Sequence, residues 1–371
     1  MTFYFLVLFG FYFVLLMVLR FGWTKAVRQS NSVQVNKTFF ISIVVPFRNE
    51  EKNIELVLDS ISKIDYPASN FEVILVNDHS TDDTIWVAEN RSGLFKNLTI
   101  VSLDENKLGK KAALTRGIDL ANGEIIVTTD ADCLVPINWL TAINYVFQDA
   151  KIKLAAGMAT ISQDKSFFSQ WQAMEFASVI GTGVAAFGYD EPFMCNGANL
   201  AFRKDTFREV GGYAGNAHIA SGDDEFLLRK ISKKYPHATA VLNVQGSVVV
   251  TQPQPSINFF LQQRLRWASK WKGNPSVTVK SLAIFILMAQ ASWVLFCFSF
   301  FSYSYEVDLL LVVLKMAADL LFLLPVQKFM KIKFRLLPFL GLQFLYPVYV
   351  LFIGIFSQLK NYEWKERTVL G

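Results

Sequence analysis

Residues 125–133 read Ile-Ile-Val-Thr-Thr-Asp-Ala-Asp-Cys, an apolar run that ends in two carboxylates one residue apart. In an extended chain, side chains two residues apart point to the same side, so Asp130 and Asp132 can face one ligand together. Carboxylates this close suit a hard divalent cation, above all one shared with a diphosphate. The alternative is a pair of solvated loop aspartates, because an isolated Asp-x-Asp occurs by chance in most long chains. The surrounding segments therefore decide between the two interpretations.

Apolar runs typical of strands alternate with amphipathic runs typical of helices before this stretch. We expect strands at residues 39–45, 71–76 and 98–103, followed by the strand that begins at Ile125. We expect helices from Asn49, from Ser80 to about Glu89, and over residues 109–120. Asn49 is a favourable N-cap, and Ser80 with Asp83 has capping-box form. The alternation predicts right-handed crossovers and a mostly parallel sheet.

Four polar segments follow the predicted strands, at residues 46–50, 77–81, 104–110 and 130–132. Ligands of such sheets bind beyond the carboxyl ends of the strands, so these segments should meet at one edge. There Asp78 can accept a hydrogen bond from a base or ribose, and Lys107 and Lys110 can neutralise phosphates. A nucleotide diphosphate bridged by a metal fits this set. An α/β core with ordinary polar loops would not gather carboxylates and lysines at one edge.

Five groups of residues resemble, in order, the motifs of family 2 glycosyltransferases of the GT-A fold. They are 44–51 (Val-Val-Pro-Phe-Arg-Asn-Glu-Glu), 77–84 (Asn-Asp-His-Ser-Thr-Asp-Asp-Thr), 107–110 (Lys-Leu-Gly-Lys) with 130–132 (Asp-Ala-Asp), 221–227 (Ser-Gly-Asp-Asp-Glu-Phe-Leu) and 263–267 (Gln-Arg-Leu-Arg-Trp). The last two resemble the acidic T-E-D-x-x-L and the Q-x-x-R-W motifs of membrane-bound members. The resemblance covers about residues 41–271. It implies a Rossmann-like GT-A domain and an inverting transfer from a nucleotide sugar, with a UDP-sugar the expected donor.

The resemblance also implies roles for individual residues. Asp224 is the expected general base, a role that typically contributes about 10²–10⁴-fold to the rate; Asp223 and Glu225 flank it, and the spacing to Leu227 favours Asp224. Asp130 and Asp132 are expected to hold Mg²⁺ or Mn²⁺, which would stabilise the leaving diphosphate. Contacts with the nucleotide sugar are expected from Pro46, Asn49, Glu50, Asp78, Lys107, Lys110 and Asp130. Contacts with the acceptor or the diphosphate are expected from Asn196, Asp223, Gln263, Arg264, Arg266 and Trp267.

The composition indicates a membrane protein, because 52% of the 371 residues are hydrophobic, 18% are charged and 34 are Phe. Four apolar segments are long enough to span a hydrocarbon core, at residues 2–19, 282–303, 309–326 and 336–356; as a helix, the first would reach about 27 Å. The first lacks a basic n-region and a small-residue cleavage site, so we expect a retained anchor rather than a secretory signal. Lys315 and Asp319 lie one helical turn apart in the third segment and are expected to pair, more as a structural pair than as a functional site.

Basic residues follow the first segment and separate the third from the fourth, which by the positive-inside rule places both flanks in the cytoplasm. The basic tail would then lie outside, against the rule, so the last segment is re-entrant or interfacial, or one assignment is wrong. The expected organisation is an anchor at 1–22, a cytoplasmic GT-A domain at 39–272, a region of about three transmembrane segments at 280–358, and a tail at 359–371. The GT-A domain is expected to end in an interfacial amphipathic helix at 257–271.

The net charge of +5 fits contact with membrane lipids better than nucleic-acid binding. The three cysteines form no Cys-x-x-Cys pair and indicate neither a disulfide framework nor zinc. Three functions remain: a single sugar addition to a lipid or lipid-linked acceptor, a processive polysaccharide synthase that exports its product, and an inactive membrane scaffold. Three carboxyl-terminal segments are few for a polymer channel, and Asp132, Asp224 and Arg266 argue against the scaffold. The sugar, the acceptor, the oligomeric state and any partner protein stay open.

Overall fold

The computed structural model describes residues 2–28, 35–216, 222–244, 246–269, 276–299, 305–357, 362–364 and 367–369. Ser221 of the acidic motif, Trp271 at the end of the predicted interfacial helix, and Lys360 and Lys365 of the tail lie outside the described residues. The chain divides into two compact units. The sheet unit comprises Lys25–Ile161 and Ala186–Gln252, and the helical unit comprises Met1–Thr24, Ser162–Ala185 and Pro253–Gly371. The predicted domain boundaries stay predictions.

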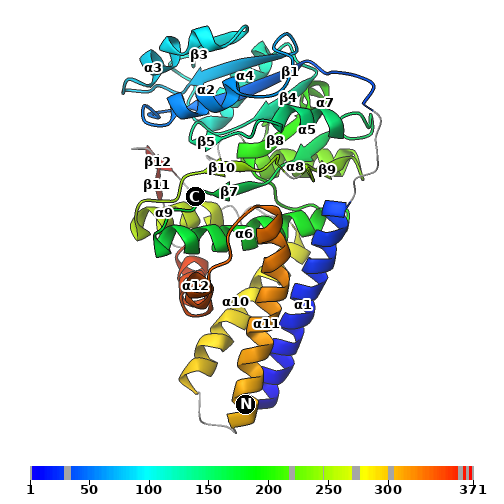
Figure 1. Ribbon diagram of the computed structural model, residues 1–371, viewed down its shortest axis with the longest axis vertical. Coiled ribbons are helices and arrows are strands. Elements are labelled where there is room, and N and C mark those ends of the chain that lie inside the picture. Colours follow the sequence, from blue (N-terminus) through cyan, green and yellow to red (C-terminus); the bar gives the residue numbers. More distant parts are fainter. Residues whose placement is uncertain are drawn as a thin grey trace. The chain divides into compact units, whose positions relative to one another are not determined.

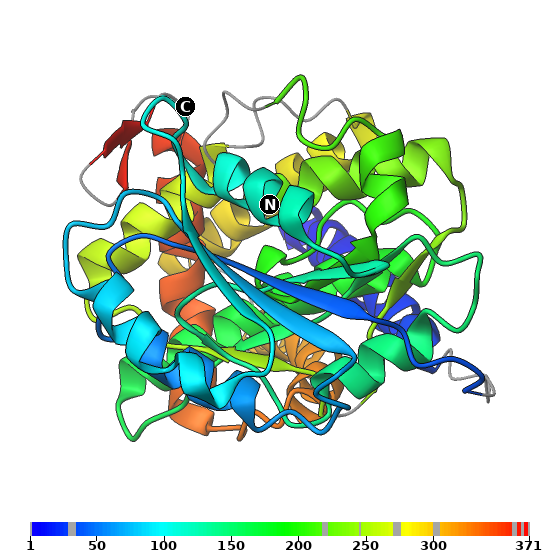
Figure 2. The same cartoon turned by 90° about the horizontal axis from the view of Figure 1, so that it is seen from above.

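The sheet unit is built on a seven-stranded sheet in the order β3-β2-β1-β4-β8-β6-β9 (Figure 1). Its strands are β1 (Ile41–Phe47), β2 (Phe71–Asn77), β3 (Leu98–Ser102), β4 (Ile125–Thr128), β6 (Leu154–Ala156), β8 (Leu200–Arg203) and β9 (Thr239–Val241). β1 pairs in parallel with β2 and with β4, and the two central strands β1 and β2 run side by side in Figure 2. β8 is antiparallel to both of its neighbours, β4 and β6. The predicted mostly parallel α/β sheet is confirmed.

Helices cover both faces of this sheet because alternate strand residues point to opposite sides. One face carries α2 (Ile54–Ser62), α3 (Thr84–Asn90) and α5 (Trp139–Val146). There Ile43 and Val45 share one core with Leu58. The other face carries α4 (Lys110–Leu120), which approaches so closely that a Cβ at Gly117 would lie 2.4 Å from Val44 Cγ1. Only glycine permits this contact, and it brings the start of α4 to the carboxyl ends of β1 and β2.

Two predicted helix starts are wrong. α2 begins at Ile54 with Asn53 as its N-cap, and Asn49 lies outside the helix with a φ of 51°. α3 begins at Thr84, so Ser80 is not its cap. Both residues instead join the two loops: the Asn49 backbone N–H donates to Ser80 Oγ at 3.0 Å. Residues that commonly cap helices here satisfy loop backbone groups instead.

The rest of the sheet unit frames the carboxyl ends of these strands. A second sheet pairs β5 (Cys133–Leu134), β10 (Val249–Thr251) and β7 (Ala159–Ile161). Two helices, α7 (Lys204–Glu209) and α8 (Asp223–Lys234), follow β8. Two short 3₁₀ turns, η1 (Ser92–Leu94) and η2 (Gly197–Asn199), complete the unit. β5 therefore begins directly after Asp132, and α8 begins at the acidic motif.

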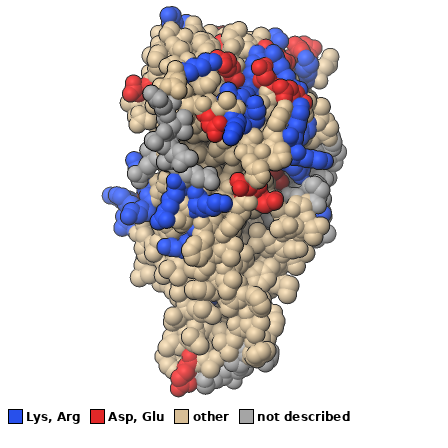
Figure 3. Space-filling model, turned by 90° about the vertical axis from the view of Figure 1, so that its right-hand side faces the viewer, with Lys and Arg blue, Asp and Glu red and all other residues tan. Residues whose placement is uncertain are grey.

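The helical unit contains α1 (Thr2–Arg28), α6 (Phe167–Phe187), α9 (Ile257–Ser269), α10 (Val277–Phe298), α11 (Tyr305–Phe329) and α12 (Leu336–Phe356), together with the short strands β11 (Tyr362–Trp364) and β12 (Arg367–Val369). In the part of the chain that the structure describes, four helices are long and apolar enough to cross a membrane: α1, α10, α11 and α12. α1, α10 and α11 run alongside one another in Figure 1. On the face shown in Figure 3, the lower part of this unit is almost free of Lys, Arg, Asp and Glu. Each of the four predicted apolar segments therefore overlaps one of these helices, and residues 300–303 of the second segment lie outside the described residues.

A buried polar cluster joins three of these helices. Lys315 Nζ lies 2.9 Å from Asp319 Oδ2, so the predicted pair on α11 forms. Tyr12 of α1 donates to Asp319 Oδ1 at 2.7 Å, and Lys315 donates to Gln343 Oε1 of α12 at 2.6 Å. In apolar surroundings such groups are stable only when they bond one another. The cluster therefore fixes which faces of the three helices meet.

Candidate active site

The loops after β1 and β2 are hydrogen-bonded into one structure at the carboxyl edge of the sheet. Arg48 Nη1 donates to the carbonyl oxygens of Asp78 at 2.9 Å and His79 at 2.8 Å. The Glu50 backbone N–H donates to Thr84 Oγ1 at 2.8 Å, which ties the first loop to the start of α3. The predicted donor residues of these two segments are thus brought together.

Pro46 lies inside a central strand, where its missing N–H would ordinarily break a ladder. The pairing of β1 with β4 ends at Val44 and Thr128, so Pro46 lies beyond the last pair on that side. On the other side β1 stays paired with β2 through Phe47 and Asn77, and Pro46 is buried.

Asp78 connects the second loop to the third. Its carboxylate is buried, and Oδ2 accepts a hydrogen bond from the Gly109 N–H at 3.0 Å. Gly109 has a φ of 93°, a conformation that glycine adopts without strain. The bond fixes the loop that precedes α4, and contact between Asp78 and a base or ribose stays a prediction.

Lys110 lies among carboxylates contributed by two other elements. Its Nζ is 2.6 Å from Asp130 Oδ1 and 3.5 Å from Asp223 Oδ2. Burial alone would lower the pKa of Lys110, but the charges of Asp130, Asp223 and Asp224 outweigh burial and raise it. Lys110 is therefore a permanent cation at this position.

Lys107 does not join this group. Its Nζ lies 3.0 Å from Asp104 Oδ2, and both side chains are more than 60% exposed. An ion pair of this kind contributes little to stability and exchanges readily with solvent. Lys107 therefore stays at the outer rim of the site.

Asp224 is held at the start of α8 by two backbone N–H groups. Oδ2 accepts from the Gly197 N–H at 3.0 Å, and Oδ1 accepts from the Glu225 N–H at 2.8 Å. A Cβ at Gly197 would lie 2.9 Å from Asp223 Oδ2 and 3.4 Å from Lys110 Nζ. The turn η2, the start of α4 and the start of α8 therefore meet at Gly197.

The asparagines on either side of Gly197 have local partners. Asn196 Oδ1 accepts from the Ala198 N–H at 2.9 Å, which shapes the turn. Asn199 is fully buried, and its Nδ2 donates to the carbonyl oxygens of Met158 and Ser247 at 2.8 and 2.9 Å. Asn199 is thus part of the framework, and the predicted acceptor contact of Asn196 stays a prediction.

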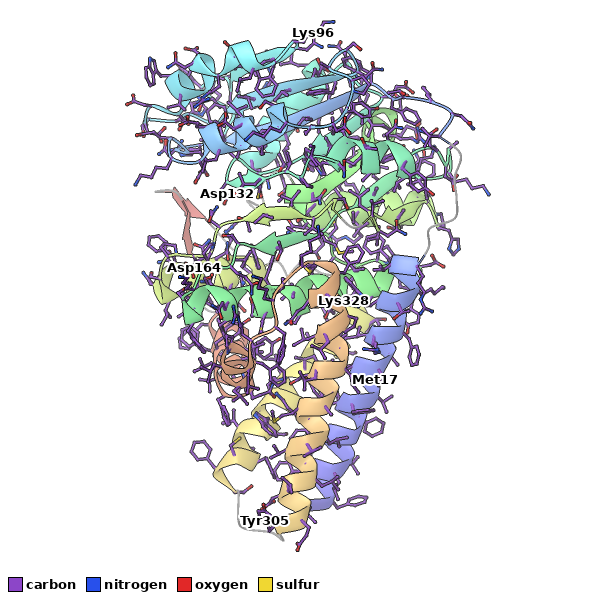
Figure 4. The ribbon with its side chains drawn as sticks, in the orientation of Figure 1. Met17, Lys96, Asp132, Asp164, Tyr305 and Lys328 are labelled. Atoms are coloured by element: carbon purple, nitrogen blue, oxygen red, sulfur yellow. The ribbon has the colours of Figure 1, made fainter. Side chains whose placement is uncertain are left out.

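The residues that follow β4 fit a hard divalent cation. Ligand atoms of Asp130, Asp132 and Cys133 all lie within 4.8 Å of one another. Burial, then the charges of Asp132 and Asp130, raise the pKa of the Cys133 thiol, which therefore stays protonated and donates to Asp132 Oδ1. Hard cations such as Mg²⁺ and Mn²⁺ prefer carboxylate oxygens to a thiol sulfur. Asp130 and Asp132 are consequently the candidate ligands; Asp132 is labelled in Figure 4.

The Q-x-x-R-W residues lie on α9 in the helical unit, and one of them has a buried partner there. Arg264 Nε lies 3.1 Å from Glu175 Oε1, and the two side chains are 5% and 0% exposed. The Arg264 guanidinium also lies 4.3 Å from the centre of the Trp267 ring. Arg264, predicted to contact the acceptor or the diphosphate, is thus engaged inside this unit. Contacts of Gln263, Arg266 and Trp267 with either ligand stay predictions.

Glu175 is a residue that the sequence reasoning missed. It is the single charged residue of the 21-residue α6, and its carboxylate also accepts from the Tyr349 hydroxyl of α12 at 2.5 Å. A lone acid in an otherwise uncharged helix is the available signal, because a buried carboxylate requires a cationic or hydrogen-bonding partner. The carboxylate therefore connects α6, α9 and α12.

Comparison with known proteins agrees with this geometry. Residues 42–211 match the family model described as Glycosyl transferase family 2. The chain is 29% identical over 194 residues to the glycosyltransferase AglE of Haloferax volcanii, covering 50% of this chain and 59% of AglE. It is 27% identical over 286 residues to the poly-beta-1,6-N-acetyl-D-glucosamine synthase of Staphylococcus epidermidis, covering 71% of this chain and 64% of the synthase. The chain thus spans about six-tenths of the length of these curated relatives.

The fold also matches a solved structure. The mannosyltransferase PcManGT from Pyrobaculum calidifontis, solved in complex with GDP-Man and Mn²⁺, superposes with a TM-score of 0.63 at 18% identity, covering 96% of this chain and 98% of that chain. At this identity the likeness concerns the fold. Residues 42–211 therefore resemble a glycosyltransferase family 2 domain and the fold is GT-A, in agreement with the motifs, whereas the assignment to the Q-x-x-R-W subtype stays a prediction.

Proposed function

We propose that the chain is an inverting glycosyltransferase that moves a sugar from a nucleotide-sugar donor, with UDP-sugars the first candidates, to a hydroxyl of a lipid or lipid-linked acceptor. The single observation that carries the proposal is the arrangement of Asp130, Asp223 and Asp224 around Lys110 at the carboxyl edge of the parallel sheet. This is where parallel α/β sheets bind their ligands. The similarity to relatives named as glycosyltransferases supports it.

Asp224 is the proposed general base. Hydrogen bonds from Gly197 and Glu225 fix the orientation of its carboxylate. A carboxylate held in this way is ready to take the proton of an acceptor hydroxyl as that oxygen attacks the anomeric carbon. One direct displacement inverts that carbon, and no second carboxylate is needed as a covalent nucleophile.

Asp130 and Asp132 are the proposed ligands of a divalent cation, either Mg²⁺ or Mn²⁺. When bound, such a cation would stabilise negative charge on the departing diphosphate. Lys110 supplies a second, permanent positive charge next to Asp130. Asp78, Asn49, Glu50 and Pro46 are proposed to line the nucleotide side, because their loops are bonded to one another at the same edge.

A processive polysaccharide synthase is the second candidate. The observation that favours it is the similarity to the Staphylococcus epidermidis synthase, which extends over 71% of this chain. The predicted three carboxyl-terminal membrane segments favour a single addition. The two candidates differ in the size of the product.

Incubation of membranes that contain the protein with radiolabelled UDP- and GDP-sugars tests the proposal. A small product that organic solvent extracts is expected for a single addition to a lipid, and a large product that stays in the aqueous phase would favour the synthase. No metal-dependent incorporation or donor hydrolysis with any sugar of either set would contradict the proposed activity.

The proposed location of the catalytic residues is the cytoplasmic side of a membrane, where nucleotide sugars are made. Lys25 and Arg28, the basic residues in the last turn of α1, support this orientation. Lipids surrounding α1, α10, α11 and α12 would then be the natural environment of the acceptor.

A further inference from the structure

A cavity of about 590 Å³ lies in the sheet unit between the start of α4 and the turn that follows α7. α4 contributes Lys111 and Ala112, and the other side contributes Arg208 and Tyr213. Among the described residues that line the cavity, Lys107, Lys111 and Arg208 are basic and none is acidic. A concave site lined by one sign of charge concentrates ligands of the opposite sign. The cavity is thus suited to an anion.

The three cations differ in what they have to offer a ligand. Lys111 Nζ donates to the Asn216 carbonyl oxygen at 2.7 Å and lies 4.7 Å from the centre of the Phe226 ring, so it is a fixed charge in the wall. Lys107 lies at the rim in an exposed pair with Asp104. Arg208 is exposed, and among the described residues its guanidinium has no hydrogen-bond or ion-pair partner. A guanidinium presents paired donors that match two oxygens of a phosphate.

The opposite wall is a glycine-rich turn. Gly211, Gly212 and Gly215 have φ values of 72°, 46° and 83°. A Cβ at Gly212 would lie 2.7 Å from the Phe207 ring, so no larger residue fits there. Lys230 of α8 donates to the carbonyl oxygens of Gly212 and Ala214, at 2.6 and 2.7 Å, on either side of Tyr213. These bonds hold the backbone on either side of Tyr213, and the Tyr213 ring packs edge-on against Phe207 at 5.2 Å.

Tyr213 forms a wall between the cavity and the proposed base. It lines the cavity, yet burial, then the charges of Asp223 and Asp224, raise the pKa of its hydroxyl. The phenol therefore stays protonated and lies within the field of both carboxylates. Lys111 lies over Phe226, two positions after Asp224 in α8. A group bound in the cavity would be a near neighbour of the catalytic edge.

We propose that this cavity binds a phosphate group of the acceptor, so that the acceptor is a phosphate ester whose hydroxyl lies beside Asp224. The inference rests on the proposed function, since it names the substrate class of that site. A phosphate ester carries one to two negative charges at neutral pH, which the guanidinium of Arg208 and the fixed charge of Lys111 complement. Two sources share this chemistry, a lipid phosphate and a soluble phosphate ester.

Three variants of the full-length chain separate this site from the rest of the surface. Arg208→Gln removes the cation whose N–H groups have no hydrogen-bond partner among the described residues. Ala112→Glu places a carboxylate in the cavity at the third residue of α4, where a negative charge favours the helix. Arg116→Gln is the control for the loss of an arginine. Arg116 is exposed and lies on α4, as Ala112 does, but it does not line the cavity.

Calorimetric titration in a neutral detergent, with dodecyl phosphate and with inorganic phosphate as probes, measures the site. We expect dodecyl phosphate to bind, Arg208→Gln and Ala112→Glu each to weaken it roughly tenfold or more, and Arg116→Gln to leave it unchanged. Binding of dodecyl phosphate alone supports a lipid phosphate, and equal binding of inorganic phosphate supports either source. Failure of dodecyl phosphate to bind, or binding that Arg208→Gln leaves intact, overturns the proposal.

Two further measurements keep the inference distinct from the proposed function. Binding of dodecyl phosphate that Asp132→Asn abolishes would place the anion at the donor site and would also overturn the proposal. Metal-dependent hydrolysis of the donor without acceptor, measured on the same samples, reports on the transferase site alone. Hydrolysis without dodecyl phosphate binding defeats this inference only, whereas binding with neither donor hydrolysis nor sugar incorporation defeats the proposed transfer and leaves the anion site.

Discussion

Gly197 lies at the most crowded point of the candidate active site, where a single methyl group has no room. Its N–H holds Asp224, and its Cα faces Asp223 and Lys110. The catalytic side chains are thus positioned by a glycine, which has no side chain of its own. This close approach arises from long-range packing and leaves no local sequence signal.

Gly197→Ala should lower turnover at least tenfold while the protein still folds and inserts. The added Cβ would lie 2.9 Å from Asp223 Oδ2, so the start of α8 or the turn has to shift, and small misplacements of catalytic groups are costly. The measurement is turnover at saturating donor. Gly93→Ala is the matched control, because a Cβ at Gly93 meets nothing within 4 Å; equal activity of the two variants would contradict the assignment.

Asp224→Asn should retain folding and donor binding and lose about 10²–10⁴-fold in turnover, since a carboxamide cannot take the proton of the acceptor. Glu225→Gln should lose much less, although both acids lie in the first turn of α8 and would stabilise a helix equally. Turnover and donor affinity are measured side by side. Near-normal turnover of Asp224→Asn would move the base elsewhere, first to Asp223.

Asp132→Asn should weaken the metal dependence of donor binding, because it removes one of the two carboxylates that fit the cation. Donor affinity is measured by titration with Mn²⁺ and with Mg²⁺ present at increasing concentration. Chelation of the metal from the unaltered protein should reproduce the effect of the variant. Donor affinity and metal dependence equal to those of the unaltered protein would remove the metal assignment.

Sequence alone located the acidic residues of the site but not the way each is held. Asp130 and Asp132 were expected from their position after a strand, whereas Asp224, the second residue of α8, was expected from the resemblance to the family's acidic motif. Asn49 and Ser80 were misread because the residue types that cap helices also bind loop backbone groups. Whether such a residue caps a helix or binds a loop depends on the neighbouring loop, which is more than 25 residues away in sequence.

At the scale of elements, the strand order was predictable only in part. The alternation of strands and helices predicts parallel strands joined by right-handed crossovers, but it does not predict that β4 lies beside β1, on the side opposite β2. The insertion of antiparallel β8 between β4 and β6 has no such signal, because its partners are set by the return of the chain from α6. The apolar helices were predictable because length and hydropathy alone define them.

The Glu175–Arg264 pair gives an element-scale prediction. Glu175→Gln should destabilise the protein by about 3–5 kcal/mol, because it leaves a buried guanidinium without its counter-charge. The double variant Glu175→Gln/Arg264→Met should recover part of this loss, since it removes the charge as well. The unfolding midpoint in detergent is the measurement.

Glu124→Gln is the control for that comparison. Its partner is Lys37, and both side chains are 52% exposed, so a loss of about 1 kcal/mol or less is expected. If Glu175→Gln and Glu124→Gln shift the midpoint equally, the buried pair contributes no more than a surface one.

At the scale of the whole molecule, the orientation in the membrane is the feature that labelling can test. In a background that lacks Cys133, Cys195 and Cys297, a cysteine at the exposed Asn90 should resist an impermeant reagent in intact cells and react after lysis. A cysteine at Tyr305, the first residue of α11, should react in intact cells. The reverse result would invert the proposed orientation.

The helical unit is assembled from three stretches of the sequence, and α6 lies between the two that contain the four long apolar helices. A chain shortened to about residues 41–271, the part that resembles the family, would keep α6 and α9 and would lose α12. Trp171 and Phe260 would then lose the ring of Tyr349, which lies 5.7 and 5.4 Å away, and the Glu175 carboxylate would lose a hydrogen bond. Removing α1, α10, α11 and α12 would therefore yield an aggregation-prone fragment that requires detergent, rather than a water-soluble enzyme.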